Sequence, residues 1–202
     1  MKKVKICGLK SLKDISYINE FKPNYAGVIF APSKRQVDKA LGKEILNNLR
    51  PGILKVGVFT NESIENINYI VKYCDLDIVQ LHGDEEPDFG KHINARVWKA
   101  FRISGIEDLE LMERYHAEGY LLDTYSKDSY GGTGKRFNWD ILKSVTSKKT
   151  IILAGGINAD NVTEALDIDV IDVLDVSSGV ETAGTKDKDK IKILIEKVRN
   201  HG

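Results

Sequence analysis

The sequence predicts an α/β protein, a single-domain (β/α)8 TIM barrel that spans residues 1–202. Eight short segments rich in β-branched residues recur along the chain, and segments with helical spacing separate them. Several of the apolar segments are continuous rather than alternating, which is typical of parallel strands covered on both faces. The expected strands are residues 4–6, 25–29, 54–59, 78–81, 97–101, 120–122, 150–154 and 170–176.

Helices are expected between these strands because apolar residues recur there every three or four positions. Ser11 and Asp14 form an acidic capping box, which predicts a helix beginning at this point. Asn61 is the expected N-cap of a helix with Ile64 in its buried stripe. A last stripe of apolar residues with helical spacing begins at Ile191 and predicts a helix near the end of the sequence. Further helices are expected at residues 41–49, 85–93, 106–115, 139–145 and 161–166.

The main structural alternative is an open, doubly wound sheet, which has the same alternation of strands and helices. Eight units in 202 residues leave about 25 residues for each unit, a tight fit that leaves no room for a second domain. The sequence shows no low-complexity tract and no linker, so the closed barrel is the preferred prediction.

Composition restricts the partners that the sequence suggests. Lysine and arginine together number 30, as do aspartate and glutamate, so nothing points to a nucleic acid or an acidic membrane surface. The two cysteines, Cys7 and Cys74, lack the spacing of a zinc site or a disulfide framework. There is no signal peptide and no apolar segment of membrane-spanning length, so we expect a cytoplasmic protein. The sequence does not distinguish a monomer from a homodimer.

Two glycine-containing loops follow the last two expected strands. Gly155 and Gly156 come after the seventh strand, and Ser178 and Gly179 come after the eighth. Backbone N–H groups in such loops can bind a phosphate, and these are the two loops at which barrels commonly do so. Glycines in single loops are more often turn residues, but their occurrence in both loops favours a phosphorylated small-molecule substrate.

The long loop after the sixth strand contains the segment 131–135, which includes Gly132 and resembles a P-loop. The match fails because Ser129 stands at the first glycine position and Arg136 stands where a serine or threonine must bind magnesium. A mobile lid with glycine hinges and an ordinary flexible loop both remain open as interpretations.

Cys7 and Asp123 are the candidate proton-transfer residues. Each comes at the end of an expected strand, and strands one and six lie on different sides of the barrel mouth. A thiolate and a carboxyl group on opposite sides of one substrate could act as base and acid. Alternatively, Cys7 is a small buried apolar residue and Asp123 caps a loop. Lys5 could be too distant from Cys7, or point outward.

Other polar residues follow the strands. Arg35 could bind a substrate carboxylate, although loop arginines are usually solvated. His82 and the three acids after it resemble a metal cluster, but acidic residues at this place more simply complement the N-terminus of the next helix. His82 itself could be functional or structural. Asp175 is ambiguous, and Cys74 is expected to be structural.

At these residues the chain resembles the phosphoribosylanthranilate isomerase family of tryptophan biosynthesis. Single motifs are weak evidence, but their ordered set spans nearly the whole chain. Two departures, Lys34 and Ala183, concern loop shape rather than chemistry. The matching segments are Lys5-Ile6-Cys7-Gly8-Leu9, Gly27-Val28-Ile29-Phe30 with Ser33 and Arg35, Val56-Gly57-Val58-Phe59, Gln80-Leu81-His82-Gly83, Gly131-Gly132-Thr133-Gly134 with Phe137 and Trp139, Leu153-Ala154-Gly155-Gly156-Ile157 with Asn161-Val162, and residues 175–181.

The resemblance implies an Amadori rearrangement of N-(5-phosphoribosyl)anthranilate to 1-(2-carboxyphenylamino)-1-deoxyribulose 5-phosphate. It makes Asp123 the general acid and Cys7 the general base, and it assigns the substrate carboxylate to Arg35. It implies no cofactor and no metal. The remaining implied substrate-binding residues are His82, Gly132, Gly155, Gly156, Ser178 and Gly179.

Two other functions were weighed against this one. The ribose-phosphate isomerase family of the histidine pathway uses two aspartates, one of them at the end of the first strand. This chain has Cys7 at that position. A non-catalytic barrel would have no need for both Cys7 and Asp123. The isomerase of tryptophan biosynthesis is therefore the preferred prediction.

Overall fold

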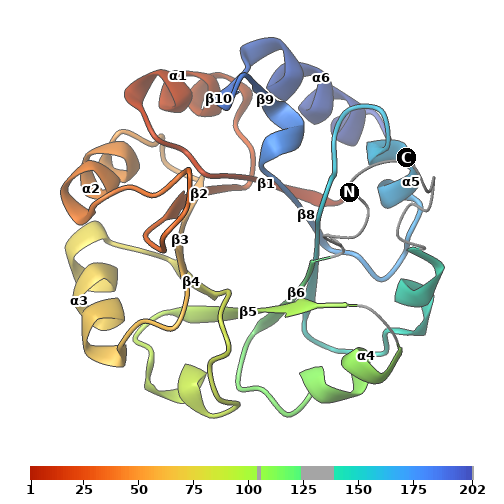
Figure 1. The fold of residues 1–202 in the computed structure, drawn as a ribbon. Helices are drawn as coiled ribbons and strands as arrows, with labels where there is room; N and C mark the ends of the chain where they lie inside the picture. Colours follow the sequence, from red (N-terminus) through yellow and green to blue (C-terminus); the bar gives the residue numbers. More distant parts are fainter. Residues whose placement is uncertain (104–105, 124–138, 202) are drawn as a thin grey trace.

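The structure is a computed structural model that describes residues 1–103, 106–123 and 139–201. Eight parallel strands close into a barrel in the order of the sequence, and the helices form a ring outside it (Figure 1). The predicted closed barrel is therefore confirmed, and the open sheet is excluded. The strands are β1 (Lys3–Cys7), β2 (Tyr25–Ile29), β3 (Leu54–Phe59), β4 (Ile78–Leu81), β5 (Arg96–Arg102), β6 (Gly119–Asp123), β7 (Thr150–Ala154) and β8 (Val173–Val176).

The observed helices agree with the prediction where a capping residue precedes a stripe of apolar residues. Ser11 and Asp14 form the expected capping box at the start of α1. The α-helices are α1 (Leu12–Phe21), α2 (Lys39–Asn47), α3 (Ile64–Cys74), α4 (Ile106–Met112), α5 (Val162–Leu166) and α6 (Lys188–Arg199). Short 3₁₀ helices cover Phe89–His92, Trp139–Ser144 and Ser178–Val180. Among the described residues, no helix is long and apolar enough to cross a membrane.

Three local predictions were wrong. Ser63, not Asn61, caps α3; Asn61 instead adopts a left-handed backbone with φ of 50° and accepts a hydrogen bond from the N–H of Asp84. The helix expected at 85–93 is reduced to one 3₁₀ turn, because Glu85 is committed to the preceding loop. The last strand begins at Val173 rather than three residues earlier.

Hydrophobic residues form two clusters. The larger cluster lies between the strands and the surrounding helices. The smaller cluster fills the inside of the barrel, where the rings of Tyr25 and Trp98 meet edge to face at 4.9 Å between centroids. Its buried members are Tyr25, Val56, Ile78, Trp98, Ala100, Leu121, Ile152, Ala154 and Val173.

Polar side chains lie above this inner cluster, toward the carboxyl ends of the strands. Successive side chains of a strand point to opposite faces, so a residue two positions beyond an inward-facing one also faces inward. Ile78, Leu121 and Val173 are inward-facing, and the residues two positions on are Gln80, Asp123 and Asp175. The barrel is thus apolar in its middle and polar at its carboxyl end, which places the candidate chemistry there.

A small hairpin follows β8. Strands β9 (Glu181–Thr182) and β10 (Thr185–Lys186) pair antiparallel, and both lie on the α1 and α6 side of the ring (Figure 1). The Nζ of Lys10, between β1 and α1, donates to the carbonyl of Gly184 in the hairpin turn. This hairpin therefore closes over the β1 side of the barrel mouth.

Replacing Gly119 by Ala is expected to destabilise the protein by overpacking the barrel interior. A Cβ at this position would lie 2.6 Å from Cδ1 of Trp98 and 2.9 Å from Cδ1 of Ile152. Such overpacking typically costs about 1 to 3 kcal/mol in the free energy of unfolding, which urea denaturation measures. Asn47→Ala on the exposed side of α2 is the control. An unchanged midpoint for Gly119→Ala would show that the interior accommodates the methyl group.

Candidate active site

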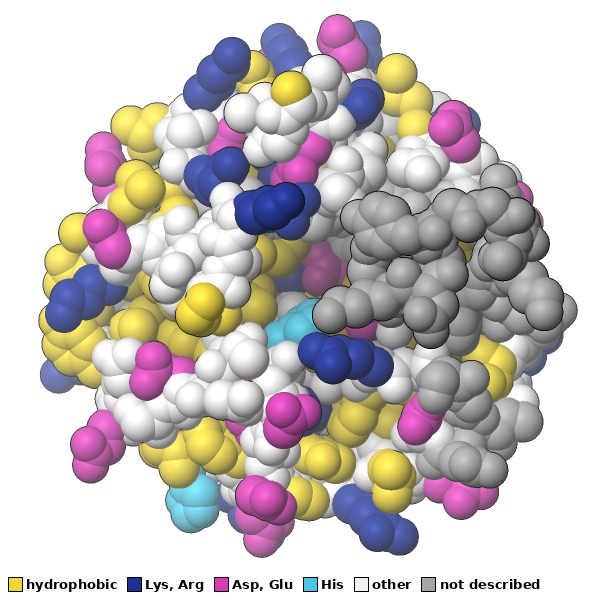
Figure 2. Space-filling view, in the orientation of Figure 1, with side chains coloured by type: hydrophobic (Ala, Val, Ile, Leu, Met, Phe, Trp, Pro, Cys, Tyr) yellow, Lys and Arg dark blue, Asp and Glu magenta, His cyan; other side chains and the backbone are white. Residues whose placement is uncertain are grey.

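The candidate catalytic residues gather at one end of the barrel. Cys7 ends β1, Asp123 ends β6, and His82 follows β4. Because β6 and β1 are separated around the ring by β7 and β8, Cys7 and Asp123 come from different sides of the mouth. Figure 2 shows basic, acidic and histidine side chains around a hollow at the barrel axis. The predicted convergence of these strand ends is therefore present.

Cys7 is buried beside a lysine. A Cβ on Gly27 of β2 would lie 3.0 Å from Sγ of Cys7 and 3.0 Å from Cε of Lys5, so this glycine lets the two side chains approach each other. Burial raises the pKa of the Cys7 thiol above its ordinary value, while the positive charge of Lys5 acts in the opposite direction. Lys5 is fully buried and faces the barrel interior, so the idea that it could point outward was wrong.

Lys5 is held by two residues on other strands. Its Nζ donates to Oδ2 of Asp175 on β8 at 2.8 Å and to Oε1 of Gln80 on β4 at 2.6 Å. Burial by itself lowers the pKa of Lys5, but interactions with the ionised side chains of Asp175 and Cys7 more than compensate, so the pKa is raised. Lys5 therefore remains a cation inside the barrel.

The polar contacts continue from Gln80 to the opposite side of the mouth. Nε2 of Gln80 lies 3.1 Å from Nδ1 of His82, and Nε2 of His82 lies 3.4 Å from Oδ2 of Asp123. The side chains of His82 and Asp123 are 30% and 23% exposed, so both can reach a molecule bound in the mouth. Cys7 and Asp123 are thus the two ends of a continuous row of polar side chains.

Arg35 is oriented by Glu181 of β9. The Nε and Nη2 atoms of Arg35 each donate to a carboxylate oxygen of Glu181 at 2.7 Å, and Nζ of Lys186 donates to the same carboxylate at 2.7 Å. Burial alone would raise the pKa of Glu181, but these hydrogen bonds lower it to about 2. The side chain of Arg35 is 29% exposed, but this ion pair fixes its orientation. It is held at the β1 side of the mouth, close to Gly8.

Glu85, one of the acidic residues after β4, has a different role from the one predicted. Glu85 is buried and accepts hydrogen bonds from the backbone N–H groups of Asn61 and Gly83. Its carboxylate also lies 3.1 Å from Nζ of Lys99. Glu85 thus stabilises the loop that carries His82 instead of complementing a helix N-terminus. Within the described part of the chain, no group of His, Cys, Asp or Glu is placed to hold a metal ion.

The two glycine-containing loops lie against each other. Gly155 and Gly156 have φ of 94° and 66°, a region that glycine adopts without strain. A Cβ on Gly179 would collide with the carbonyl of Ile157, so the loop after β8 packs directly on the loop after β7. A Cβ on Gly156 would meet open space. The backbone of this pair is therefore shaped and accessible for a ligand, while the predicted residue Gly132 lies outside the described residues.

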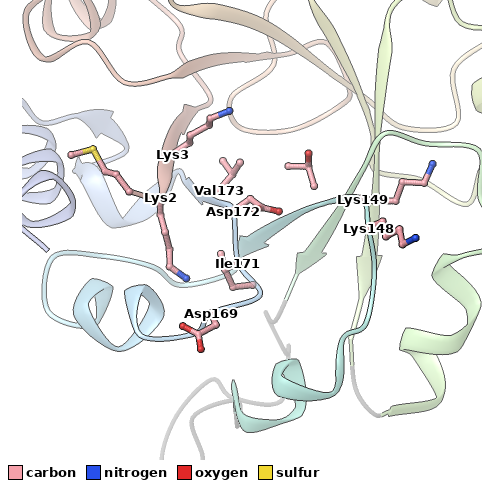
Figure 3. Close-up of a pocket in the computed structure, with 10 residues that line it drawn as sticks. Lys2, Lys3, Lys148, Lys149, Asp169, Ile171, Asp172 and Val173 are labelled. Carbon is pink, nitrogen blue, oxygen red and sulfur yellow. The ribbon is translucent and has the colours of Figure 1, made fainter. Parts of the chain in front are cut away.

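A separate pocket of about 510 Å³ opens at the other end of the barrel (Figure 3). It lies near the amino ends of β1, β7 and β8, and both Lys2 and Asp169 line it. Barrel enzymes place their chemistry at the carboxyl ends of the strands, so this pocket is not the active site.

Comparisons with known proteins agree with this geometry. The sequence profile described as N-(5'phosphoribosyl)anthranilate (PRA) isomerase matches residues 4–197. The chain belongs to this family. The PRA isomerase of Thermoanaerobacter pseudethanolicus is 48% identical over 200 residues, 98% of each chain, and that of Clostridium acetobutylicum is 45% identical over 202 residues. This PRA isomerase family member is accordingly an isomerase of tryptophan biosynthesis.

Solved PRA isomerases share the fold. The structure from Thermotoga maritima is 37% identical, covers 98% of this chain and 99% of its own, and superposes with a TM-score of 0.90. Another PRA isomerase, 34% identical with a TM-score of 0.86 and the same coverage, is in complex with reduced 1-(o-carboxyphenylamino)-1-deoxyribulose 5-phosphate. The predicted family, fold and Amadori isomerisation are therefore confirmed.

Sequence analysis missed several residues of this site. For Lys5, excessive distance from Cys7 and an outward orientation were both left open. Gln80 and Glu181 were seen only as parts of motifs, and Lys186 received no role. Alternation along the strands could have revealed Lys5 and Gln80, because each is a polar residue at an inward-facing position. Glu181 gave no such signal, since its contact with Arg35 spans 146 residues of sequence.

Glu181 is expected to make stability depend on pH. Its pKa is depressed in the folded state, so its contribution is complete above the ordinary value of 4.5 and is lost as pH falls toward about 2. Glu181→Gln should therefore be less stable than the parent at neutral pH, and the difference in urea midpoint should shrink across this interval. A constant difference at every pH would contradict the role of its ionised carboxylate.

Proposed function

We propose that Cys7 is the general base and Asp123 the general acid of an Amadori rearrangement of N-(5'-phosphoribosyl)anthranilate. The observation that carries the proposal is the placement of a buried thiol and a partly exposed carboxyl group at the ends of β1 and β6, on different sides of one mouth. An aldose–ketose isomerisation of this type needs one group to protonate the ring oxygen and another to remove a proton from carbon.

In the first step the carboxyl group of Asp123 gives its proton to the furanose ring oxygen. The bond from C1 to the ring oxygen breaks, and the lone pair of the anilino nitrogen forms the C=N bond of a Schiff base. His82, 3.4 Å from Asp123, fixes the orientation of the carboxyl group during this transfer. The exposure of Asp123 on the mouth gives it access to the substrate oxygen.

In the second step the thiolate of Cys7 removes the proton from C2. The electrons of this C–H bond form the C1=C2 bond of an enolamine, and the C=N electrons return to nitrogen. The enolamine then becomes the ketone by losing the proton of its C2 hydroxyl and gaining a proton at C1. Burial of Cys7 keeps water away from the carbanion-like transition state.

The ends of the substrate match the groups around the mouth. Arg35, which Glu181 orients, suits the planar carboxylate of the anthranilate ring. The phosphate suits the backbone of the paired loops at Gly155, Gly156, Ser178 and Gly179, where glycines permit close approach. His82 contacts the ribose between these ends. Gly132 is part of the proposal on sequence grounds alone.

We place the enzyme in the cytoplasm, where the thiol of Cys7 stays reduced; both cysteines are free and buried. A solved relative is described as a dimeric enzyme from which monomers were generated, so this chain is a monomer or a homodimer. Sedimentation of the purified protein distinguishes the two.

Replacing Cys7 by Ala, or Asp123 by Asn, should lower kcat by on the order of 10²-fold or more, as removal of a general acid or base does. The measurement is the loss of phosphoribosylanthranilate fluorescence with purified protein. Lys192→Ala on the exposed side of α6 is the control and should retain parental turnover. Near-parental kcat in either active-site variant would refute that residue's role, and an inactive parent would refute the function.

A further inference from the structure

A buried ion pair inside the barrel calls for a functional explanation. Barrel interiors are normally filled with branched apolar side chains, yet Lys5 and Asp175 face one another in this interior. Buried ion pairs contribute little net stability, because desolvation offsets the attraction between the charges. Among the described residues, no donor reaches Oδ1 of Asp175, so this pair is not optimised for hydrogen bonding alone. The pair lies directly beneath Cys7.

The ammonium group of Lys5 decides how Gln80 is oriented. An ammonium group has only donors, so the atom of Gln80 that faces it must be the carbonyl oxygen, Oε1. The amide nitrogen of Gln80 then faces His82 as a donor. This assignment follows from the chemistry of lysine and does not depend on the atom names given to the amide.

Gln80 in turn decides the tautomer of His82. Because the amide N–H of Gln80 points at Nδ1, this ring nitrogen must accept. The proton of the neutral imidazole therefore resides on Nε2, the atom that lies 3.4 Å from Asp123. The charge of Lys5 on β1 thus determines that the Nε2–H of His82 faces the carboxyl group of Asp123 on β6.

Lys5 acts on Cys7 as well. The two side chains meet over Gly27, where the absent side chain leaves room for both. The other charged groups near the thiol are Asp175, Lys186 and Arg35. Lys186 and Arg35 both bind the carboxylate of Glu181, whose single negative charge offsets part of their combined positive charge.

We propose that Lys5 and Gln80 are positioning residues that prepare both catalytic groups at once. Lys5, anchored by Asp175, stabilises the thiolate of Cys7. Lys5 also fixes the amide of Gln80, and this amide fixes the tautomer of His82. The Nε2–H of His82 then orients the carboxyl group of Asp123. The proposal rests on the proposed function for the roles of Cys7 and Asp123. Gln80 transmits orientation only, since its amide neither gains nor loses a proton.

The first test measures the pKa of Cys7 without substrate. In a Cys74→Ala background Cys7 is the only thiol, and its thiolate is followed by ultraviolet absorbance as pH is raised. Lys5→Met should raise the pKa of Cys7 by about one or more, the usual effect of losing a nearby opposite charge. The acidic limb of the kcat/KM profile should move to higher pH with it.

Lys99→Met is the matched control for this test. Lys99 is also buried and paired with a carboxylate, Glu85, but it neighbours the inward-facing Trp98 on β5 and so lies on the outer side of the barrel. It should lower the midpoint of unfolding without changing the pKa of Cys7. A folded Lys5→Met protein with the parental pKa of Cys7, or an equal change in Lys99→Met, would overturn the role of Lys5.

The second test identifies the tautomer of His82 in the parent protein. The nitrogen chemical shifts of its ring, assigned with a His82→Gln variant, should show a neutral ring protonated at Nε2. Gln80→Leu should remove this preference and lower kcat with little change in KM. Protonation at Nδ1 in the parent, or an unchanged tautomer in folded Gln80→Leu, would overturn the role of Gln80.

These tests separate the proposal from the function on which it rests. The thiolate titration and the nitrogen shifts need no substrate, so they remain informative if the parent fails to turn over phosphoribosylanthranilate. Conversely, the parent could be active while Lys5→Met leaves the pKa of Cys7 unchanged and Gln80→Leu leaves the tautomer of His82 unchanged. That result would support the proposed function and refute the positioning role.

Discussion

The pairing of β1 with β8 is the constraint on which the site depends. It closes the barrel and sets Lys5 opposite Asp175 in register, so a buried cation and its counter-ion occupy adjacent strands. With the ring closed, β4 and β6 come around to the same mouth, and their side chains can meet those of β1. An open sheet of the same strands would leave Lys5 at an edge, without its partner and without an interior.

The apolar layer of the barrel supports this polar layer from below. Trp98 and Tyr25 fill the middle of the interior, and close packing there leaves little freedom for the strands above. The strand-end side chains are therefore set by rigid elements rather than by loops. The hairpin of β9 and β10 adds the remaining group, because Glu181 holds Arg35 through two hydrogen bonds. Rigid strands and one bidentate pair together define the mouth.

The fold could be predicted from the sequence because the strands and helices of the barrel follow from local sequence patterns. Continuous apolar runs marked the strands, and the Ser11 capping box marked a helix start. The failures arose where a distant residue decided a local conformation. Asn61 lost the N-cap position because its side chain bonds across to Asp84. The helix expected after β4 shrank because Glu85 is bound by loop amides and Lys99. No pattern within either segment carries this information.

The candidate site divides in the same way. Cys7, Asp123 and Arg35 were identified from their positions after strands and from family resemblance. Alternation could mark Lys5 and Gln80 as inward-facing, but their contacts with Asp175 and His82 depend on the arrangement of β1, β4 and β8 in the closed barrel. The role of Lys5 can be judged by comparing it with an apolar residue at the same position. An apolar residue at position 5 would spare the desolvation of an ammonium group, and such replacements are often neutral or stabilising. It would also leave the Gln80 amide free to flip and His82 free to change tautomer. The buried charge is therefore better explained by what it orients than by the stability it provides.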